Sequence, residues 1–562
     1  MKIFNFNLKF IVQTLFVIIF LSTSPAKSLD KFNKADRVSD YFSGILLLND
    51  NRYEDSLRYL ESLNGLERSH INYSNNYLYS LVNSGNLKKA FIYSRKLEKQ
   101  KMDSFESHLI SGIFYLKNSD IDLAKKYFLK AKNKNPRFIL NNFVSNSLYN
   151  WANLTNLNQA SLDLKKLDER FKNLKKIQNI FLNCYFRNSN TNNLFSEITS
   201  KQNTDFSRYN YFYASYLVST GKTEKAKEIV RNALKLYPRN LLLNQYKINL
   251  NKNINILIFD CKKEKDVIAE ILYITANALS SQSIYSLSNF YLNLAKYLND
   301  DFHSYDTLIA ENFYKTNNFK KAKKIYRNLS KNGEAFNWYS SKQLARIFLQ
   351  DENKKDALKL LNKSYNNLLN KEIYETFDYA EFLKNNEKFE ESIQFYTKII
   401  KQIEKDHPLY AEATDGRGVA FERIGEWNKA EKDLLSSLEA DPNQAYVINY
   451  LAYSWIEQGL QIKKSLNMLV KANQLRSNDP FITDSLGWAL FKLKRYKEAK
   501  KYLQQAVRLM PADPIINDHF GDALWKNGNE IQARYYWNYV LKLEKTEDKL
   551  KKTIQEKLIK GL

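Results

Sequence analysis

The 562-residue chain is poor in the residues that several classes of protein require. Two cysteines exclude a disulfide-dense scaffold and a cysteine-rich zinc module. Fourteen glycines and eight prolines are few for an all-β protein, which needs many tight turns. The five histidines show no metal-ligand spacing, so we expect no metal site. Hydrophobic residues nevertheless make up 44% of the chain, which is ample material for a folded core.

Acidic residues are scarce relative to basic ones. The chain has 61 Asp and Glu against 86 Lys and Arg, which gives a formal net charge of +25. Such an excess can indicate a nucleic-acid partner or an anionic surface. Abundant Asn, Ile, Tyr and Phe accompany it here, a combination typical of a proteome-wide compositional bias. We therefore favour the compositional explanation and expect no nucleic-acid partner.

Only one apolar run of note occurs, near the N-terminus. It extends from Phe10 to Leu21, which is shorter than the roughly 20 residues that a membrane-spanning helix needs. Lysines precede it, and Ala26-Lys27-Ser28 follows as a small-x-small cleavage pattern. We predict that residues 1–28 are a signal peptide cleaved after Ser28, which makes the protein periplasmic or secreted. The alternative is that the segment remains as a membrane anchor.

The rest of the chain contains a repeat of about 34 residues. Gly487 and Gly521 are 34 residues apart, and alanines follow twelve residues later at Ala499 and Ala533. Apolar residues between these positions recur at helical spacing. A period of this length with helical spacing inside it is typical of a helix–turn–helix solenoid. The small residues are expected where the two helices of a pair approach closely, because larger side chains would overpack the contact.

This pattern resembles the tetratricopeptide repeat. The residues that match it most completely are Gly112, Tyr115, Ala124, Phe128, Ala131 and Pro136, with Gly418, Phe421, Ala430, Leu434 and Pro442. The resemblance implies an all-α fold, a tetratricopeptide-type α-solenoid in which antiparallel helix pairs form a right-handed superhelix. We place an N-terminal array with degenerate central repeats at 29–270, a C-terminal array at 271–545 and a basic capping helix at 546–562. Peripheral membrane association of that helix stays open.

Residues 417–545 resemble, more narrowly, the C-terminal half of secreted proteobacterial tetratricopeptide proteins. The segments that carry this resemblance are 449–455, 484–489 and 516–525. One type in that group is an outer-membrane lipoprotein that acts as adaptor for a periplasmic processing protease of cell-wall hydrolases. The present chain has no cysteine directly after its apolar run, where that lipoprotein carries its lipid.

No block of about 100 residues lies outside the repeats, which leaves no room for a catalytic domain of ordinary size. We therefore expect a non-enzymatic protein without cofactor or small-molecule substrate. Asp518 and His519 together with Ser485 suggest a catalytic triad at first sight. They occupy repeat-defined positions one repeat apart, however, so we expect a structural role for them.

Cys184 and Cys261 are 77 residues apart, which is about two repeats. Helices spaced 8–10 Å apart would then separate them by roughly 20 Å. A disulfide needs Cα atoms within about 7 Å. We therefore expect two free, buried thiols.

In the tetratricopeptide family, the first helix of each repeat lines the concave face. Positions carried over by this resemblance form a ladder in the C-terminal copies, and the predicted partner-binding residues are Asp415, Asn449, Tyr453, Asp484, Trp488, Asp518, Asp522 and Trp525. Carboxylates and amides can accept hydrogen bonds from a peptide backbone, and Tyr and Trp supply contact area. The alternative is that the acidic residues only complement the dipoles at helix starts and that the aromatics belong to the core.

We infer an extracytoplasmic scaffold that binds a protein or peptide partner of the cell envelope along the concave surface. One alternative is a regulatory subunit of a cell-envelope enzyme such as a processing protease. Another is an RNA-binding helical repeat protein, which the signal segment and the small-residue pairs argue against.

Overall fold

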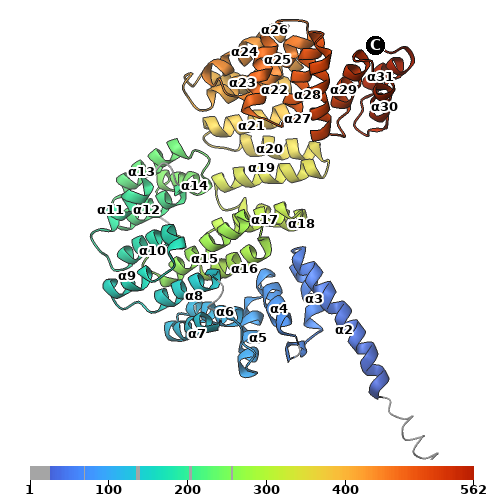
Figure 1. Ribbon diagram of the computed structural model, residues 1–562. Helices are drawn as coiled ribbons and strands as arrows, with labels where there is room; N and C mark the ends of the chain where they lie inside the picture. The colour runs from blue at the N-terminus through green and yellow to red at the C-terminus, as the bar shows by residue number, and fades with distance from the viewer. Residues whose placement is uncertain (1–25, 69, 135–138, 201–205, 255–256) are drawn as a thin grey trace, which may run out of the picture. The chain divides into compact units, whose positions relative to one another are not determined.

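The computed structural model describes residues 26–68, 70–134, 139–200, 206–254 and 257–562. The predicted signal peptide lies almost wholly outside these residues, and the first described helix, α2, begins at Ala26. The described residues form α-helices and two short 3-10 turns, with no strand (Figure 1). No described helix is both long and apolar enough to cross a bilayer. The predicted all-α solenoid is confirmed.

The chain divides into two compact units, residues 1–364 and 365–562. The helix pairs of the first unit are α2 (Ala26–Asn49) with α3 (Tyr53–Glu61), α4 (Ile71–Asn83) with α5 (Leu87–Lys99), α6 (Phe105–Lys117) with α7 (Ile121–Lys134), α8 (Ile139–Ala152) with α9 (Leu157–Lys165), α10 (Lys172–Tyr185) with α11 (Thr191–Thr199), α12 (Ser207–Ser219) with α13 (Thr223–Leu236), α15 (Glu264–Ser281) with α16 (Tyr285–Leu298), α17 (Ser304–Lys315) with α18 (Phe319–Leu329), and α19 (Glu334–Gln350) with α20 (Lys354–Asn366).

One further helix of the first unit, α14 (Leu241–Asn251), has no second helix. The pairs of the second unit are α21 (Ile373–Asn385) with α22 (Phe389–Ile400), α23 (Tyr410–Arg423) with α24 (Trp427–Ala440), α25 (Ala445–Glu457) with α26 (Ile462–Leu475), α27 (Pro480–Lys492) with α28 (Tyr496–Leu509), and α29 (Pro514–Lys526) with α30 (Glu530–Lys542). A last helix, α31 (Asp548–Lys560), follows them.

Small residues lie where the helices of a pair are closest. A Cβ atom added to Gly487 would lie 2.6 Å from a Leu503 side-chain carbon, and one added to Gly112 would lie 2.4 Å from the Phe128 ring. Both distances are far below van der Waals contact, so only glycine fits without rearrangement. The repeat pattern therefore predicted these contacts correctly.

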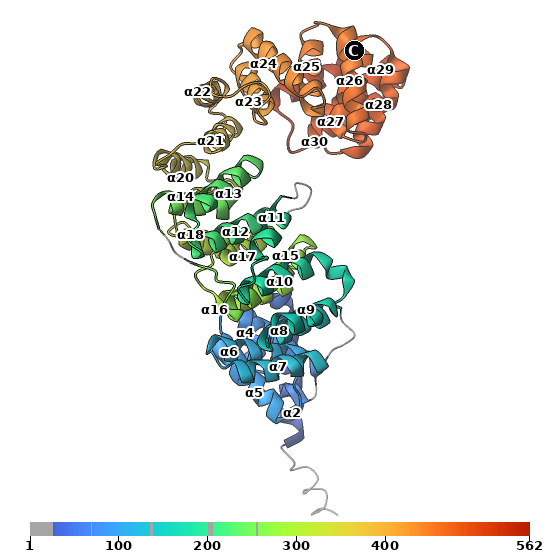
Figure 2. The same cartoon turned by 90° about the vertical axis from the view of Figure 1, so that its left-hand side faces the viewer.

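The first unit folds back on itself. Helix α16 packs against α4 and α6, helix α15 packs against α8, and α14 packs against α19 (Figures 1 and 2). Contacts between residues far apart in sequence hold this arrangement, such as the hydrogen bond from Asn83 Nδ2 to the Ser286 carbonyl at 3.1 Å. A simple linear stack of repeats has contacts only between neighbours. This unit therefore departs from the expected arrangement.

The expectation of two free thiols is wrong. Cys184 and Cys261 form a disulfide, and their Cα atoms are 6.0 Å apart. Cys184 lies near the end of α10, and Cys261 lies in the connection between α14 and α15. Because α15 returns to pack against α8, the chain between the cysteines forms an excursion rather than two further steps along a straight stack. The estimate of roughly 20 Å assumed such steps.

The C-terminal helix α31 covers the end of the second unit. Ile554 is fully buried, and Leu550 and Leu558 pack beside it against the core formed by α28 to α30. The apolar stripe of this helix is therefore turned toward the protein and is not free to lie on a membrane.

Candidate functional site

The eight predicted binding residues all lie on first helices of the second unit. Asp415 is on α23, Asn449 and Tyr453 are on α25, and the others are on α27 and α29. Helix α21 contacts α23, α25 contacts α27, and α27 contacts α29. The Tyr450 hydroxyl of α25 donates to Glu422 of α23 at 2.7 Å. These helices therefore form a continuous inner layer of the unit. The i, i+4 spacing of Asn449 and Tyr453 places both on one helix face.

The last two acidic positions are already occupied by a cation of the same chain. Lys557 of α31 donates to Asp518 at 2.6 Å and to both oxygens of Asp522 at 2.7 and 2.8 Å. Its side chain is only 12% exposed. Burial raises the pKa of Asp522 to about 6, neighbouring Asp518 adds to this, and Lys557 opposes it. At this end of the inner layer, two buried carboxylates hold an ammonium group.

The next position contains a buried histidine–carboxylate pair. His519 Nδ1 lies 2.9 Å from Asp484 Oδ2, and the imidazole stacks under the Trp488 ring at 3.9 Å between centroids. Burial disfavours the charged imidazolium, but Asp484 and the other nearby carboxylates outweigh this effect and raise the pKa of His519. Asp484 is 5% and Trp488 8% exposed, and the Trp488 indole donates to Glu457 at 2.7 Å. Both residues are largely built into the protein.

The same contacts exclude the catalytic triad suggested by the sequence. The Ser485 hydroxyl donates to the Phe481 carbonyl at 2.9 Å, within its own helix. His519 pairs with Asp484, and Asp518 binds Lys557. No described group of three or more His, Cys, Asp or Glu residues has the arrangement of a metal site.

Trp525 lies under the C-terminal end of the chain. A Cβ atom at Gly561 would fall 2.0 Å from the Trp525 ring, and the Arg534 guanidinium lies over that ring at 5.0 Å from its centroid. Lys526 Nζ donates to the main-chain oxygen of Leu562 at 3.1 Å. Gly561 and Arg534 therefore contact part of this half-buried ring, which was predicted to bind a partner.

The first positions of the ladder are open at Asp415 and Tyr453, whereas the Asn449 Oδ1 atom is buried without a hydrogen-bond partner. Asp415, Asn449 and Tyr453 are half-buried, and none of the three side chains has a hydrogen-bond or ion-pair partner among the described residues. Burial raises the pKa of Asp415 to about 6, Lys384 opposes this, and Glu381 adds to it. Burial also raises the pKa of the Tyr453 hydroxyl, with Glu457, Asp484 and Asp518 adding. The open positions thus lie in a strongly acidic surrounding.

Charge in the second unit is separated between its two helix layers. The first helices of its five pairs contain ten Asp and Glu against five Lys and Arg. The second helices contain seven Asp and Glu against twelve Lys and Arg. The inner layer is therefore acidic in a chain whose net charge is +25. An acidic, partly dry surface attracts cations more strongly than exposed carboxylates do.

The repeat period predicts the ladder positions but not all of the partners that they have within the chain. His519 lies 35 residues after Asp484, which is one repeat, so the pairing of neighbouring first helices indicates this contact. Lys557 belongs to a helix outside the repeats, and no periodic signal marks it.

Family models described as tetratricopeptide repeat match residues 309–546 and 207–240. The TPR repeat-containing protein PA4667 of Pseudomonas aeruginosa is 29% identical over 127 residues, which are 22% of this chain. The match spans about a fifth (21%) of the length of that relative. Solved structures with a similar fold include MamA from Desulfovibrio magneticus, at 17% identity and a TM-score of 0.28, covering 32% of this chain and 99% of the other. PilF of Pseudomonas aeruginosa has 20% identity and a TM-score of 0.28, covering 33% and 88%.

Proposed function

Because this chain belongs to the tetratricopeptide repeat proteins, a class that generally mediates protein–protein interactions, we propose that its second unit binds an extended, positively charged polypeptide segment. The segment lies along the inner helices and contacts Asp415, Asn449 and Tyr453 first. The observation that carries this proposal is the acidic inner layer in a basic chain. Proteins built from such repeats are generally non-catalytic scaffolds, and the proposed role needs no chemistry beyond recognition.

The open positions offer two complementary kinds of contact. The Asp415 carboxylate can accept hydrogen bonds from backbone N–H groups or from Lys and Arg side chains. Tyr453 offers a ring edge and a hydroxyl, the combination that dominates binding energy in many interfaces. The raised pKa of Asp415 shows that burial disfavours its charged form. A bound cation would offset this free-energy cost.

A peptide-binding comparison tests this proposal. Labelled peptides of net positive, neutral and net negative charge are titrated with the protein by fluorescence anisotropy. The double variant Asp415→Asn with Tyr453→Ala should weaken binding of the positive peptides about tenfold or more, which is about 1.4 kcal/mol. The control is Glu439→Gln with Tyr535→Ala, because both of these side chains are 68% exposed on second helices.

Two results would contradict the proposal. One is equal affinity for all three peptide classes. The other is an equal loss of affinity in the test and control variants. The positive charge of the whole chain repels a basic peptide at long range, so binding of such a peptide requires a local acidic surface.

The proposal also includes a location outside the cytoplasm, in the periplasm or the medium, and a partner of the cell envelope. Its support is the sequence of residues 1–28, with a basic start, a short apolar run and a small-x-small site. N-terminal sequencing of the protein from an osmotic-shock fraction should give Leu29 as the first residue. Recovery only from the cytoplasm, with Met1 intact, would contradict this location.

A further inference from the structure

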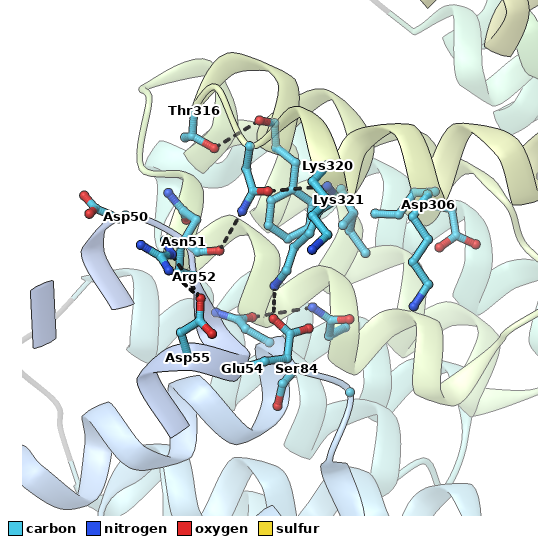
Figure 3. Close-up of a pocket in the computed structure, with 18 of the residues that line it drawn as sticks. Asp50, Asn51, Arg52, Glu54, Asp55, Ser84, Asp306, Thr316, Lys320 and Lys321 are labelled. Atoms are coloured by element: carbon cyan, nitrogen blue, oxygen red, sulfur yellow. Dashed lines mark hydrogen bonds and ion pairs between the residues drawn. The ribbon is translucent and has the colours of Figure 1, made fainter. Parts of the chain in front are cut away.

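A large cavity, lined mostly by polar and charged residues, lies in the first unit, where the unit folds back on itself (Figure 3). Its volume is about 1000 Å³. The turns before α3 and α5 form one side of it, and helices α16, α17 and α18 form the other. Contacts across the fold hold the two sides together: Asn318 Nδ2 donates to the Asn51 carbonyl at 3.3 Å, and Asn289 Nδ2 donates to the Tyr53 hydroxyl at 3.0 Å. A simple stack of repeats would not form this cavity.

Most charged side chains of the cavity are paired across it or beside it. Five Lys and Arg and four Asp and Glu line the cavity. Lys296 pairs with Asp306 at 2.6 Å, Arg52 pairs with Asp55 at 2.8 Å, and Lys321 pairs with Glu54. Two lysines and one acid, Asp50, remain without a partner among the described residues. The uncompensated charge of the lining is therefore positive.

The two unpaired cations are Lys320 and Lys324 of α18. They are one helical turn apart, and Asn328 continues the same stripe one turn further. Figure 3 shows Lys320 beside the space between α18 and the α2–α3 turn. Two ammonium groups and an amide thus follow one another along a wall of the cavity.

This arrangement is electrostatically unfavourable for the helix that contains it. Lys320, Lys321, Lys323 and Lys324 lie in the first two turns of α18, and no acidic residue occurs in its first turn. The start of a helix carries partial positive charge, and like charges one turn apart repel each other. The turns before α3 and α5 also open into the cavity, and neither of these helices has a side-chain cap. Residues that break a local rule in this way often serve a ligand.

We propose that this cavity binds an anionic ligand that carries at least two phosphate or carboxylate groups on a polar body. Lys320 and Lys324 hold the anionic groups, and the amides of the lining contact the polar body. The volume matches that of known small-molecule sites, at their upper end. This site is separate from the acidic inner layer of the second unit, and neither proposal depends on the other.

Isothermal titration of the purified protein with two probes, inorganic tripolyphosphate and tricarballylate, tests the assignment. The test variant is Lys320→Met with Lys324→Met. The matched control is Lys359→Met with Lys363→Met, an exposed lysine pair with the same spacing on α20 that does not line the cavity. Circular dichroism checks that both variants keep their helices.

We expect one probe molecule bound per chain, an affinity loss of about tenfold or more in the test variant, and a change below about twofold in the control. Binding of tripolyphosphate alone identifies phosphate as the ligand group, and binding of tricarballylate alone identifies carboxylate. Equal losses in test and control would show attraction to the general positive charge and overturn the proposal. So would the absence of binding by both probes at low ionic strength, where charged contacts are strongest.

Discussion

Replacing Asp415 by Asn should stabilise the second unit at neutral pH. The half-buried carboxylate has its pKa raised to about 6 from an ordinary value of 3.8, chiefly by burial. A raised pKa in the folded state means that the protonated form stabilises the fold. The wild-type protein therefore loses stability as pH rises from about 4 to above 6, and the variant lacks this loss. Removing the charge should thus strengthen the fold at the expense of the proposed binding surface.

The magnitude follows from the shift. One pKa unit corresponds to about 1.4 kcal/mol, so a difference of about two units sets an upper limit near 3 kcal/mol. Solvent reaches part of the Asp415 side chain and screens its charge, which reduces the expected gain to about 1–2 kcal/mol at pH 7. At pH 4 the folded carboxyl is protonated, and the gain should fall to a few tenths of a kcal/mol by the same relation.

Urea unfolding followed by tryptophan fluorescence measures this difference. Five of the seven tryptophans lie in the second unit, so the signal reports mainly on that unit. Glu439→Gln, an exposed change on α24, serves as the control and should have little effect at either pH. A variant at Asp415 that is no more stable than the wild type at pH 7, or that gains equally at pH 7 and pH 4, would refute the reasoning.

Two further changes test the contacts within each unit. Lys557→Met should lower the free energy of unfolding of the second unit by about 3 kcal/mol, because it leaves two buried carboxylates without their cation. This loss of stability should become smaller toward pH 5, because Asp522, whose pKa is about 6, then takes up a proton. An equal loss at pH 7 and pH 5 would contradict this role. Replacing Cys184 and Cys261 together by Ser should cost the first unit about 2–4 kcal/mol in thermal or urea unfolding. Detection of two free thiols in the denatured, unreduced wild-type protein would show that the bond is absent.

The helix pairs could be predicted from the sequence because the residues that form each pair lie close together along the chain. A glycine such as Gly487 and its partner Leu503 are 16 residues apart, within one repeat, and the same small-to-large contact recurs in other copies. Period and residue size together specify such a contact without knowledge of the rest of the chain.

The fold-back of the first unit has no such local signal. It depends on contacts like that of Asn83 with the Ser286 carbonyl, made by single amides about 200 residues apart. No period marks these residues, and an amide on a helix surface is equally compatible with exposure to water. The disulfide was missed for the same reason, since its geometry follows from the return of α15 to α8.

The proposed binding surface could be predicted from the sequence only in part. The ladder positions follow from the repeat, but whether each position is open depends on groups outside the repeat. Lys557 closes the position of Asp518, and His519 closes most of that of Asp484. A partner that approaches the inner layer of the second unit therefore has to engage Asp415 and the residues of α25 first. At the far end of the layer, the Lys557 ammonium group occupies Asp518 and Asp522. Because Asp415 belongs to the same acidic layer, we expect the open end to accept a positive charge as well. If positive peptides bound as well after Asp415→Asn as before, that inference from one end of the layer to the other would fail.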